Sequence, residues 1–298
     1  GVQTCALPIC KLVTVTPTSP TVTYGASIPT ISVLSYTGWK TGETQSVLTA
    51  TPSCTTTYTA TSPVASTPTT QCASAAAANY TFSYPTGTVT IQRKAAVITA
   101  ASLNRTYGDN VPAVTWSYSG LVNGENGDAI VTGSPNCSTT YVSTSAFGTT
   151  PTTTCTGASA ANYTFTYGGG SVANAKRPIT VTASSPTVTY GDSIPSITPS
   201  YSAFQNGETS SVVSSTSCAT TYTPTSAVAT TPTTTCSGAS AANYSFSYTG
   251  GAVTIQRKGL TVTASSPTVT YGDAVPSVTP SYAGLVNSES GSVRSEEH

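Results

Sequence analysis

Residues 180–202 read TVTASSPTVTYGDSIPSITPSYS, and residues 261–283 read TVTASSPTVTYGDAVPSVTPSYA, so the two stretches differ at only four of 23 positions. The Tyr-Gly pair inside them recurs along the whole chain, at Tyr24, Tyr107, Tyr190 and Tyr271, with spacings of 83, 83 and 81 residues. Self-similarity at a fixed period is the signature of a tandem repeat protein. The pattern predicts repeats over residues 11–93, 94–176 and 177–257, followed by a truncated fourth repeat over residues 258–293.

Within each repeat, apolar and polar residues alternate in short runs that are separated by turn residues. In the third repeat the runs include Ile179 to Ala183, Thr187 to Tyr190 and Tyr244 to Tyr248, with Ser-Ser-Pro, Tyr-Gly-Asp and Asn-Gly-Glu between them. Alternation with period two is typical of half-buried strands, and these tripeptides are typical of turns. We therefore expect an all-β chain of small β-sandwich or β-grasp-like repeats of about 80 residues, mostly antiparallel. One helical turn is expected within residues 209–214.

The composition excludes several classes of function. The 298-residue chain has ten basic and ten acidic side chains, and charged residues make up 7% of it. Without a basic excess there is nothing to neutralise phosphates, so we expect no nucleic-acid partner. No apolar run approaches the roughly 20 residues of a membrane helix, so we expect no membrane span in these residues.

The two ends do not follow the repeat pattern. Residues 1–10 and 294–298 match the conceptual translation of a common sequencing adapter, at opposite ends of the chain. We interpret both segments as adapter sequence and leave them out of the fold prediction. This interpretation removes the single histidine, His298, and makes Cys5 and Cys10 uninformative.

The six remaining cysteines fall two to a repeat, and the members of each pair are 18 residues apart: Cys54 and Cys72, Cys137 and Cys155, Cys218 and Cys236. This spacing suits neighbouring antiparallel strands joined by a turn, so we predict one disulfide inside each repeat. A zinc site is the alternative, but zinc ligands usually come in closer pairs and include histidine. Persistent disulfides indicate an oxidising compartment.

Charged residues occupy fixed positions in each repeat. Acidic residues follow Tyr-Gly or lie in Asn-Gly-Glu, and basic pairs stand at the repeat boundaries. If the chain reverses at Ser-Ser-Pro, the Asp of each repeat returns to the basic pair that precedes it. We therefore expect charges to meet where repeats stack and to set the angle between them, the candidates being Glu125, Lys176, Arg177, Asp192, Arg257, Lys258 and Asp273. The alternatives are that these acids only serve their turns or that they bind calcium.

Three motifs together resemble a known family. They are Tyr-Gly-Asp-x-x-Pro, the stretch YSGLVNGE at residues 118–125 and the stretch SAANYTF at residues 159–165. In order and at constant spacing, they are similar to the MBG-type (YGX) repeats of secreted and surface proteins, many of them adhesin-like. The resemblance implies an extracellular, mostly β, non-catalytic module with neighbouring repeats as its contacts. It implies no catalytic residues and no cofactor.

The residue pattern also argues against catalysis. Once the terminal segments are set aside there is no histidine, and the carboxylates come singly rather than in pairs, whereas general acid–base chemistry relies on such groups. We therefore expect a stalk or spacer that is not an enzyme. The alternative is an adhesive module that binds a glycan through exposed tyrosines, or binds another surface protein. A threonine-rich ice-binding face is a weaker alternative, because proline interrupts the Thr-x-Thr arrays.

Overall fold

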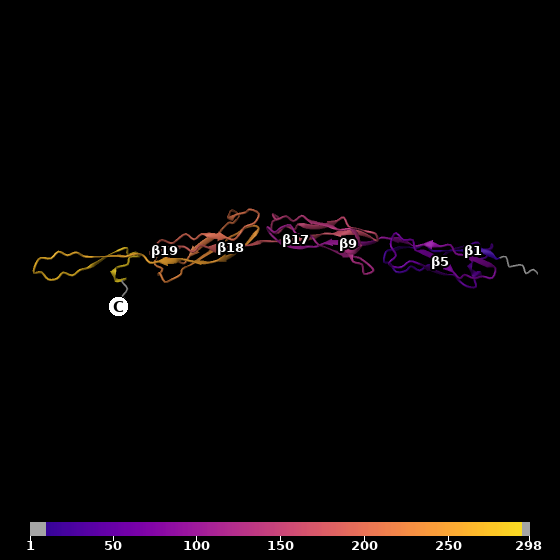
Figure 1. Cartoon of the computed structure of the whole chain (residues 1–298), viewed down its shortest axis with the longest axis horizontal. Helices are drawn as coiled ribbons and strands as arrows, with labels where there is room; N and C mark the ends of the chain where they lie inside the picture. The colour runs from indigo at the N-terminus through magenta and orange to yellow at the C-terminus, as the bar shows by residue number, and fades with distance from the viewer. Residues whose placement is uncertain (1–9, 294–298) are drawn as a thin grey trace, which may run out of the picture. The chain divides into compact units, whose positions relative to one another are not determined.

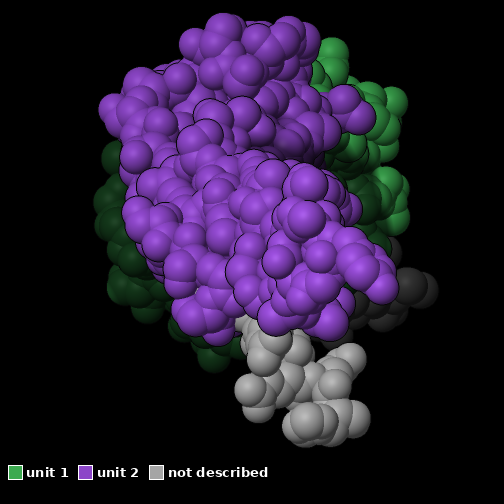
Figure 2. All heavy atoms as spheres, turned by 90° about the vertical axis from the view of Figure 1, so that its left-hand side faces the viewer, with its two compact units in different colours: residues 1–103, 111–141, 150–172 green, residues 104–110, 142–149, 173–298 purple. Residues whose placement is uncertain are grey.

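The computed structural model describes residues 10–293, and the terminal segments interpreted above as adapter sequence lie outside this range except for Cys10. The chain divides into two compact units (Figure 2). The first contains residues 1–103, 111–141 and 150–172, and the second contains residues 104–110, 142–149 and 173–298. The first unit therefore holds repeat 1 and most of repeat 2. The second holds the Tyr107 turn of repeat 2, repeat 3 and the start of repeat 4.

The described residues are almost entirely β-structure (Figure 1). The first repeat contains β1 (Lys11–Pro17), β2 (Thr21–Thr23), β3 (Val33–Thr37), η1 (Gln45–Val47), β4 (Ser53–Thr56), β5 (Thr69–Ala73), β6 (Tyr80–Ser83), β7 (Gly87–Thr88) and β8 (Thr90–Gln92). The second contains β9 (Lys94–Ala100), β10 (Leu103–Thr106), β11 (Trp116–Ser119), α1 (Gly127–Ile130), β12 (Val131–Gly133), β13 (Asn136–Thr139), β14 (Thr152–Thr156), β15 (Ser159–Ala160), β16 (Tyr163–Gly168) and β17 (Gly170–Ala175).

The third repeat contains β18 (Arg177–Ala183), β19 (Thr187–Thr189), β20 (Pro199–Tyr201), η2 (Ser210–Val212), β21 (Ser217–Thr220), β22 (Thr233–Ser237), β23 (Tyr244–Thr249), β24 (Gly251–Ala252) and β25 (Thr254–Gln256). The fourth contains β26 (Thr261–Ala264), β27 (Pro280–Ala283) and η3 (Gly291–Val293). The all-β class and the tandem repeats are as predicted, and η2 falls inside the stretch expected to hold a helical turn.

Each complete repeat is a small sandwich whose sheets are best seen in the third repeat. One sheet has the order β20-β18-β23, and another has the order β21-β22-β24. The β18–β20 and β21–β22 pairs are antiparallel, whereas β23 runs parallel to β18. Antiparallel pairs predominate, and the parallel contact lets the closing strand β23 run in the direction of the opening strand β18.

The opening strand bends into a second sheet instead of reversing. After β18 the chain passes Ser184 and Pro186, and β19 then pairs in parallel with β25, the last strand of the repeat. Buried Thr234 on β22 holds this bend, because its hydroxyl donates to the Ser184 carbonyl at 2.8 Å. Thr70 and Thr153 make the equivalent bonds in the other two complete repeats.

The bond from Thr234 gives a first testable prediction. Replacing Thr234 with valine keeps the shape of the side chain but leaves the buried Ser184 carbonyl without its donor, which we expect to cost about 1–3 kcal/mol of folding free energy. Urea denaturation measures this change. Thr235→Val is the matched control, because Thr235 lies on the same strand and is exposed. Equal stability of the two variants would show that the bond does not hold the bend.

All three predicted cysteine pairs form disulfides in the structure: Cys54–Cys72, Cys137–Cys155 and Cys218–Cys236. The members of each pair stand directly opposite each other on antiparallel strands, so each bridge crosses one hairpin. One cysteine of each pair is buried against the opening strand, as Cys236 is beside Val181 and Ala183. Each bridge therefore joins the hairpin to the core of its own repeat.

Candidate functional site

The contacts between successive repeats form the candidate functional site, and the topology decides which motifs meet there. Because β19 runs parallel to the last strand of its repeat, the Tyr-Gly turn lies at the C-terminal end of the repeat. In repeat 2 the Tyr107 N–H accordingly donates to the Ala175 carbonyl at 2.9 Å, just before the next repeat begins. The antiparallel strand β20 returns the Gln205 to Glu208 turn to the start of repeat 3. The Tyr-Gly turn of one repeat thus meets the Asn-Gly-Glu turn of the next.

A glutamate between two tyrosines forms the centre of this junction. At the junction of repeats 2 and 3, one oxygen of Glu208 accepts from the Tyr107 hydroxyl at 3.0 Å, and its other oxygen accepts from the Tyr244 hydroxyl. The Tyr244 hydroxyl in turn accepts from the Gln205 N–H at 3.1 Å. The two rings pack edge to face, with centroids 5.5 Å apart.

The same arrangement occurs at the junction of repeats 1 and 2. There Glu125 accepts from Tyr24 at 2.6 Å and also from Tyr163, whose hydroxyl accepts from the Val122 N–H at 3.1 Å. The rings of Tyr24 and Tyr163 again lie edge to face at 5.5 Å. All four tyrosines of the two junctions are at least nine-tenths buried.

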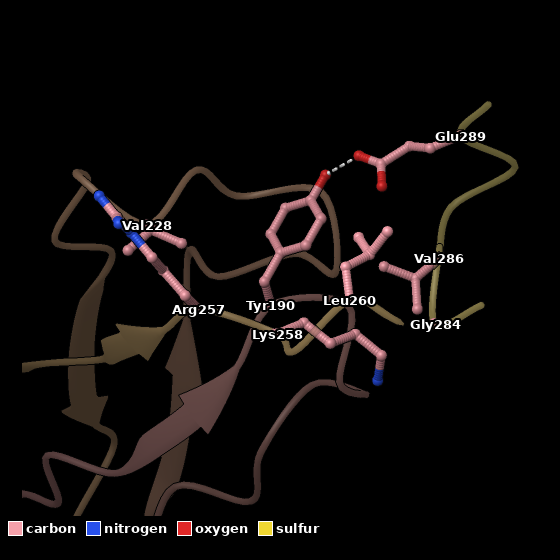
Figure 3. A pocket seen from close by; sticks show the side chains of 8 residues that line it. All are labelled: Tyr190, Val228, Arg257, Lys258, Leu260, Gly284, Val286 and Glu289. Carbon is pink, nitrogen blue, oxygen red and sulfur yellow. Dashed lines mark hydrogen bonds between the residues drawn. The ribbon is translucent and has the colours of Figure 1, made fainter. Parts of the chain in front are cut away.

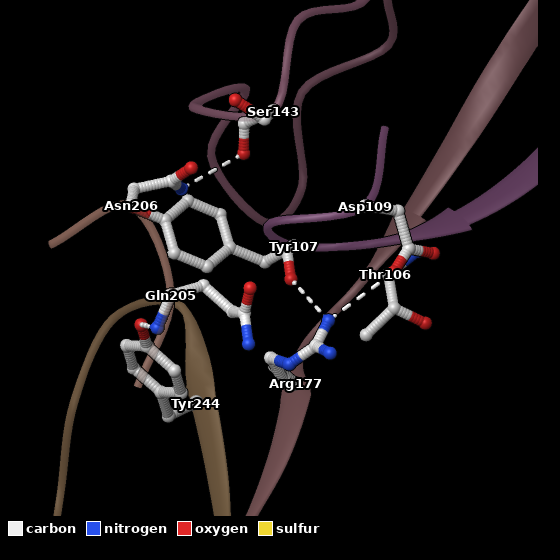
Figure 4. A network of polar contacts seen from close by, with 8 residues as sticks. All are labelled: Thr106, Tyr107, Asp109, Ser143, Arg177, Gln205, Asn206 and Tyr244. Atoms are coloured by element: carbon white, nitrogen blue, oxygen red, sulfur yellow. Dashed lines mark hydrogen bonds and ion pairs between the residues drawn. The ribbon is translucent and has the colours of Figure 1, made fainter. Parts of the chain in front are cut away.

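The glycine after each Tyr and the asparagine before each Glu also have defined roles. Gly108 has a φ of +85°, and a Cβ there would lie 2.5 Å from the Cβ of Gln205, so any side chain would prevent the close approach of the turns. Asn206 adopts the left-handed conformation, which asparagine tolerates better than most residues. Its amide donates to the Ser143 carbonyl of the preceding repeat at 3.0 Å (Figure 4).

A second loop of the preceding repeat completes the contact. The Phe147 N–H donates to the Asn243 side-chain oxygen at 3.0 Å, and the Lys176 ammonium lies 5.2 Å from the centre of the Phe147 ring. Lys176 also donates to the Ala241 carbonyl at 3.2 Å. The Val64 N–H and Asn162 make the equivalent hydrogen bond at the first junction.

One ion pair reinforces the junction of repeats 2 and 3. The Arg177 guanidinium donates to the Asp109 carboxylate and to the Tyr107 carbonyl, both at 3.1 Å (Figure 4). The Thr106 N–H, which donates to Asp109, and then Arg177 lower the pKa of the Asp109 carboxyl. The pair is partly exposed, so its contribution to stability is small beside that of the buried tyrosines.

The expected grouping of charges is therefore wrong in its directions. The Asp of each repeat lies beside the basic pair that follows it, not the one that precedes it, because the chain bends at Ser-Ser-Pro without reversing. The acids at the Arg177 junction are accordingly Asp109 and Glu208, whereas Glu125 belongs to the junction before it and Asp192 to the turn after Tyr190. Arg257 and Lys258 lie beside Tyr190 and Glu289 at the next junction, and Asp273 accepts from the Thr270 N–H within its own turn.

The sequence reasoning treated the Tyr-Gly tyrosines as core residues and did not foresee that they enter the core of the following repeat. Tyr107 packs with Ile179 and Tyr244 of repeat 3, and Tyr24 packs with Tyr163 of repeat 2. A signal was present, because Tyr-Gly and Asn-Gly-Glu keep their identity at turns, where alternation alone requires no particular residue. In repeat 1, Thr41 replaces the asparagine, but Glu43 still accepts from the Tyr80 hydroxyl.

The tyrosine network predicts a loss of stability at alkaline pH. Burial and then the hydrogen bond to Glu208 raise the pKa of Tyr244 to about 12, and the same causes act at Tyr163 through Glu125. A tyrosine in the unfolded chain ionises near its ordinary pKa of about 10. The stabilisation is therefore complete below about pH 10 and is lost as the pH rises toward 12.

Denaturant titrations across this range, together with phenolate absorbance, would measure the effect. Tyr244→Phe, which keeps the ring, should flatten the pH dependence. An unchanged slope in that variant would contradict the assignment.

Two searches bear on other kinds of site. Within residues 10–293, no three His, Cys, Asp or Glu side chains gather closely enough to hold a metal ion. Over the same residues, no helix is both long and apolar enough to cross a membrane.

The fold and the junctions together define a tandem array of disulfide-bridged β-domains, each of which completes its neighbour's core. The chain belongs to the MBG domain family (YGX type), whose model matches residues 13–90, 96–173 and 179–254. The resemblance seen in the sequence motifs is thereby confirmed. No curated protein matches the chain.

Proposed function

We propose that this chain is a non-catalytic stalk or spacer within a secreted or cell-surface, adhesin-like protein. The observation that carries the proposal is the recurrence of one buried junction. The Tyr–Glu–Tyr network joins repeat 1 to repeat 2 and repeat 2 to repeat 3 with the same residue types at matching positions. A module whose invariant residues are spent on joining copies of itself is suited to spacing other parts of a protein.

Two further features support this role. One disulfide crosses a hairpin in every complete repeat, which suits an oxidising, extracellular setting. The glutamates of the Asn-Gly-Glu motif are engaged by tyrosine hydroxyls, an arrangement that holds two turns together. The proposal includes that the chain is not an enzyme.

Small-angle X-ray scattering of the whole chain tests whether the junctions stiffen it. We expect Tyr24→Ala combined with Tyr107→Ala to give the scattering of a flexible chain of beads, with a broadened distribution of distances, because both inter-repeat contacts lose their buried ring. Tyr271→Ala is the control, because this tyrosine of the same motif is fully exposed. Identical profiles for the wild type and the double variant would count against a spacer held by its junctions.

An adhesive function is the second candidate, and exposed aromatic side chains favour it. Trp116 and Tyr167 are 37% and 39% exposed, on the strands that flank β9. Aromatic rings of this kind could stack on sugar rings or contact another surface protein. Glycan-array binding that Trp116→Ala abolishes would support this function, and binding that the variant leaves unchanged would argue against it.

A further inference from the structure

A pocket of about 280 Å³ lies where repeat 3 meets repeat 4. Its lining includes Tyr190, Arg257, Lys258, Leu260, Val286 and Glu289 (Figure 3). These residues correspond by repeat position to those of the previous junction. Leu260 stands where Ile179 stands in repeat 3, and Glu289 stands where Glu208 stands.

The apolar part of this site differs from its counterpart only in being uncovered. Ile179 and Val181 on β18 are 1% and 0% exposed, whereas the equivalent Leu260 and Val262 are 45% and 60% exposed. In repeat 3 the parallel strand β23 covers β18, with Phe246 paired to Ile179. Within residues 10–293, β26 pairs only with β27, so its other edge has no strand beside it.

The polar part of the site also matches its counterpart. Glu289 accepts from the Tyr190 hydroxyl at 2.6 Å through one oxygen, as Glu208 accepts from Tyr107. At the complete junction, the other glutamate oxygen and the N–H of Gln205 hold the hydroxyl of Tyr244, the first tyrosine of the closing strand. At the pocket, the corresponding groups are the second oxygen of Glu289 and the N–H of Val286.

We propose that β26 and this pocket bind an extended segment carrying the motif Asn-Tyr-x-Phe-x-Tyr, supplied by a separate molecule. The segment adds to the sheet in parallel with β26. Its register follows from β18 and β23, where Tyr244 pairs with Arg177, Phe246 with Ile179 and Tyr248 with Val181. The first tyrosine of the segment therefore pairs with Lys258, the phenylalanine with Leu260 and the second tyrosine with Val262.

The physical basis is strand addition to an open sheet edge, in which backbone hydrogen bonds supply affinity and side-chain pockets supply specificity. The phenylalanine covers the exposed Leu260, and the first tyrosine enters the pocket to share Glu289 with Tyr190. The partner is thus an uncharged, aromatic strand of the kind that closes each complete repeat.

A labelled synthetic peptide with the sequence of residues 237–250 (SGASAANYSFSYTG) tests the proposal against the whole chain by fluorescence anisotropy. We expect saturable binding with one peptide per chain. Peptides carrying Tyr244→Ala or Phe246→Ala should bind at least tenfold more weakly. The control peptide carries Ser245→Ala, which should stay within twofold, because Ser245 is exposed in β23.

A chain variant locates the binding site. Leu260→Asp should abolish peptide binding, and circular dichroism would check that the three complete repeats remain folded. Absence of saturable binding, or binding that is indifferent to Tyr244→Ala or to Leu260→Asp, would overturn the proposal. Sedimentation covers the remaining occupant. Chain dimers that the peptide fails to dissociate would mean that a second copy fills the edge, and would also overturn it.

Discussion

Replacing Tyr107 with alanine is expected to destabilise repeat 3 by about 3–5 kcal/mol, the usual cost of removing a large buried aromatic side chain. Tyr107 belongs to repeat 2, but its ring is 3% exposed and packs on Ile179 and Tyr244 of repeat 3. The change also removes one of the two hydroxyls that hold Glu208. We therefore expect repeats 2 and 3 to unfold separately in the variant, in two transitions resolved by calorimetry or urea denaturation.

Two other variants isolate the cause. Tyr271→Ala changes the same motif at a position that is fully exposed, and it should alter stability very little. Tyr107→Phe keeps the ring and removes one hydrogen bond, which is worth about 0.5–1.5 kcal/mol. If Tyr107→Ala were no more harmful than Tyr271→Ala, the junction would contribute nothing to the stability of its neighbour.

Removing one disulfide is expected to have the second-largest effect. The double substitution Cys218→Ala and Cys236→Ala opens a loop closed by residues 18 apart in sequence, and in the chain-entropy model a loop of this length is worth about 3 kcal/mol. For a domain of about 80 residues, a loss of this size lowers the midpoint of thermal unfolding by roughly 10–20 °C. Calorimetry of the double variant would measure this shift directly.

The free cysteine provides the matched control for the disulfide. Cys10 forms no disulfide in the structure, so Cys10→Ala should leave the midpoint unchanged. Adding a reducing agent to the wild type should reproduce the effect of the double substitution in all three complete repeats. A wild-type midpoint that does not respond to reduction would contradict a stabilising role for the bridges.

Much of the fold could be predicted because the sequence states it several times. The recurrence of Tyr-Gly at a fixed period identified the repeats, and alternation within them identified strands. The constant spacing of Cys218 and Cys236, matched in two other repeats, predicted a bridge across one hairpin. In each case, independent copies of the same pattern supported a single local interpretation.

The direction of the chain after Ser184 could not be predicted in the same way. Ser-Ser-Pro looks like a turn, and only contacts distant in sequence decide whether the strand reverses or bends. Here the Thr234 hydroxyl and the parallel pairing of β19 with β25 keep the strand moving forward. This one choice reversed the expected positions of the Asp and Glu motifs, and so the prediction of which charges meet was wrong.

The role of Tyr107 was hidden for a related reason. A buried aromatic residue at the end of an alternating run has the same local pattern whether its core belongs to its own repeat or to the next one. The distinction depends on the partner surface formed by Glu208 and Tyr244, about a hundred residues further along the chain.

The uniform chemistry of the junctions has a consequence for how such a protein can change over generations. Both complete junctions use the same glutamate, asparagine and pair of tyrosines, so any repeat end fits any repeat start. Unequal recombination between near-identical gene segments could delete or duplicate a whole repeat, and the new neighbours would meet through contacts that already exist. Reach can thus be adjusted in steps of one repeat without any new interface having to evolve.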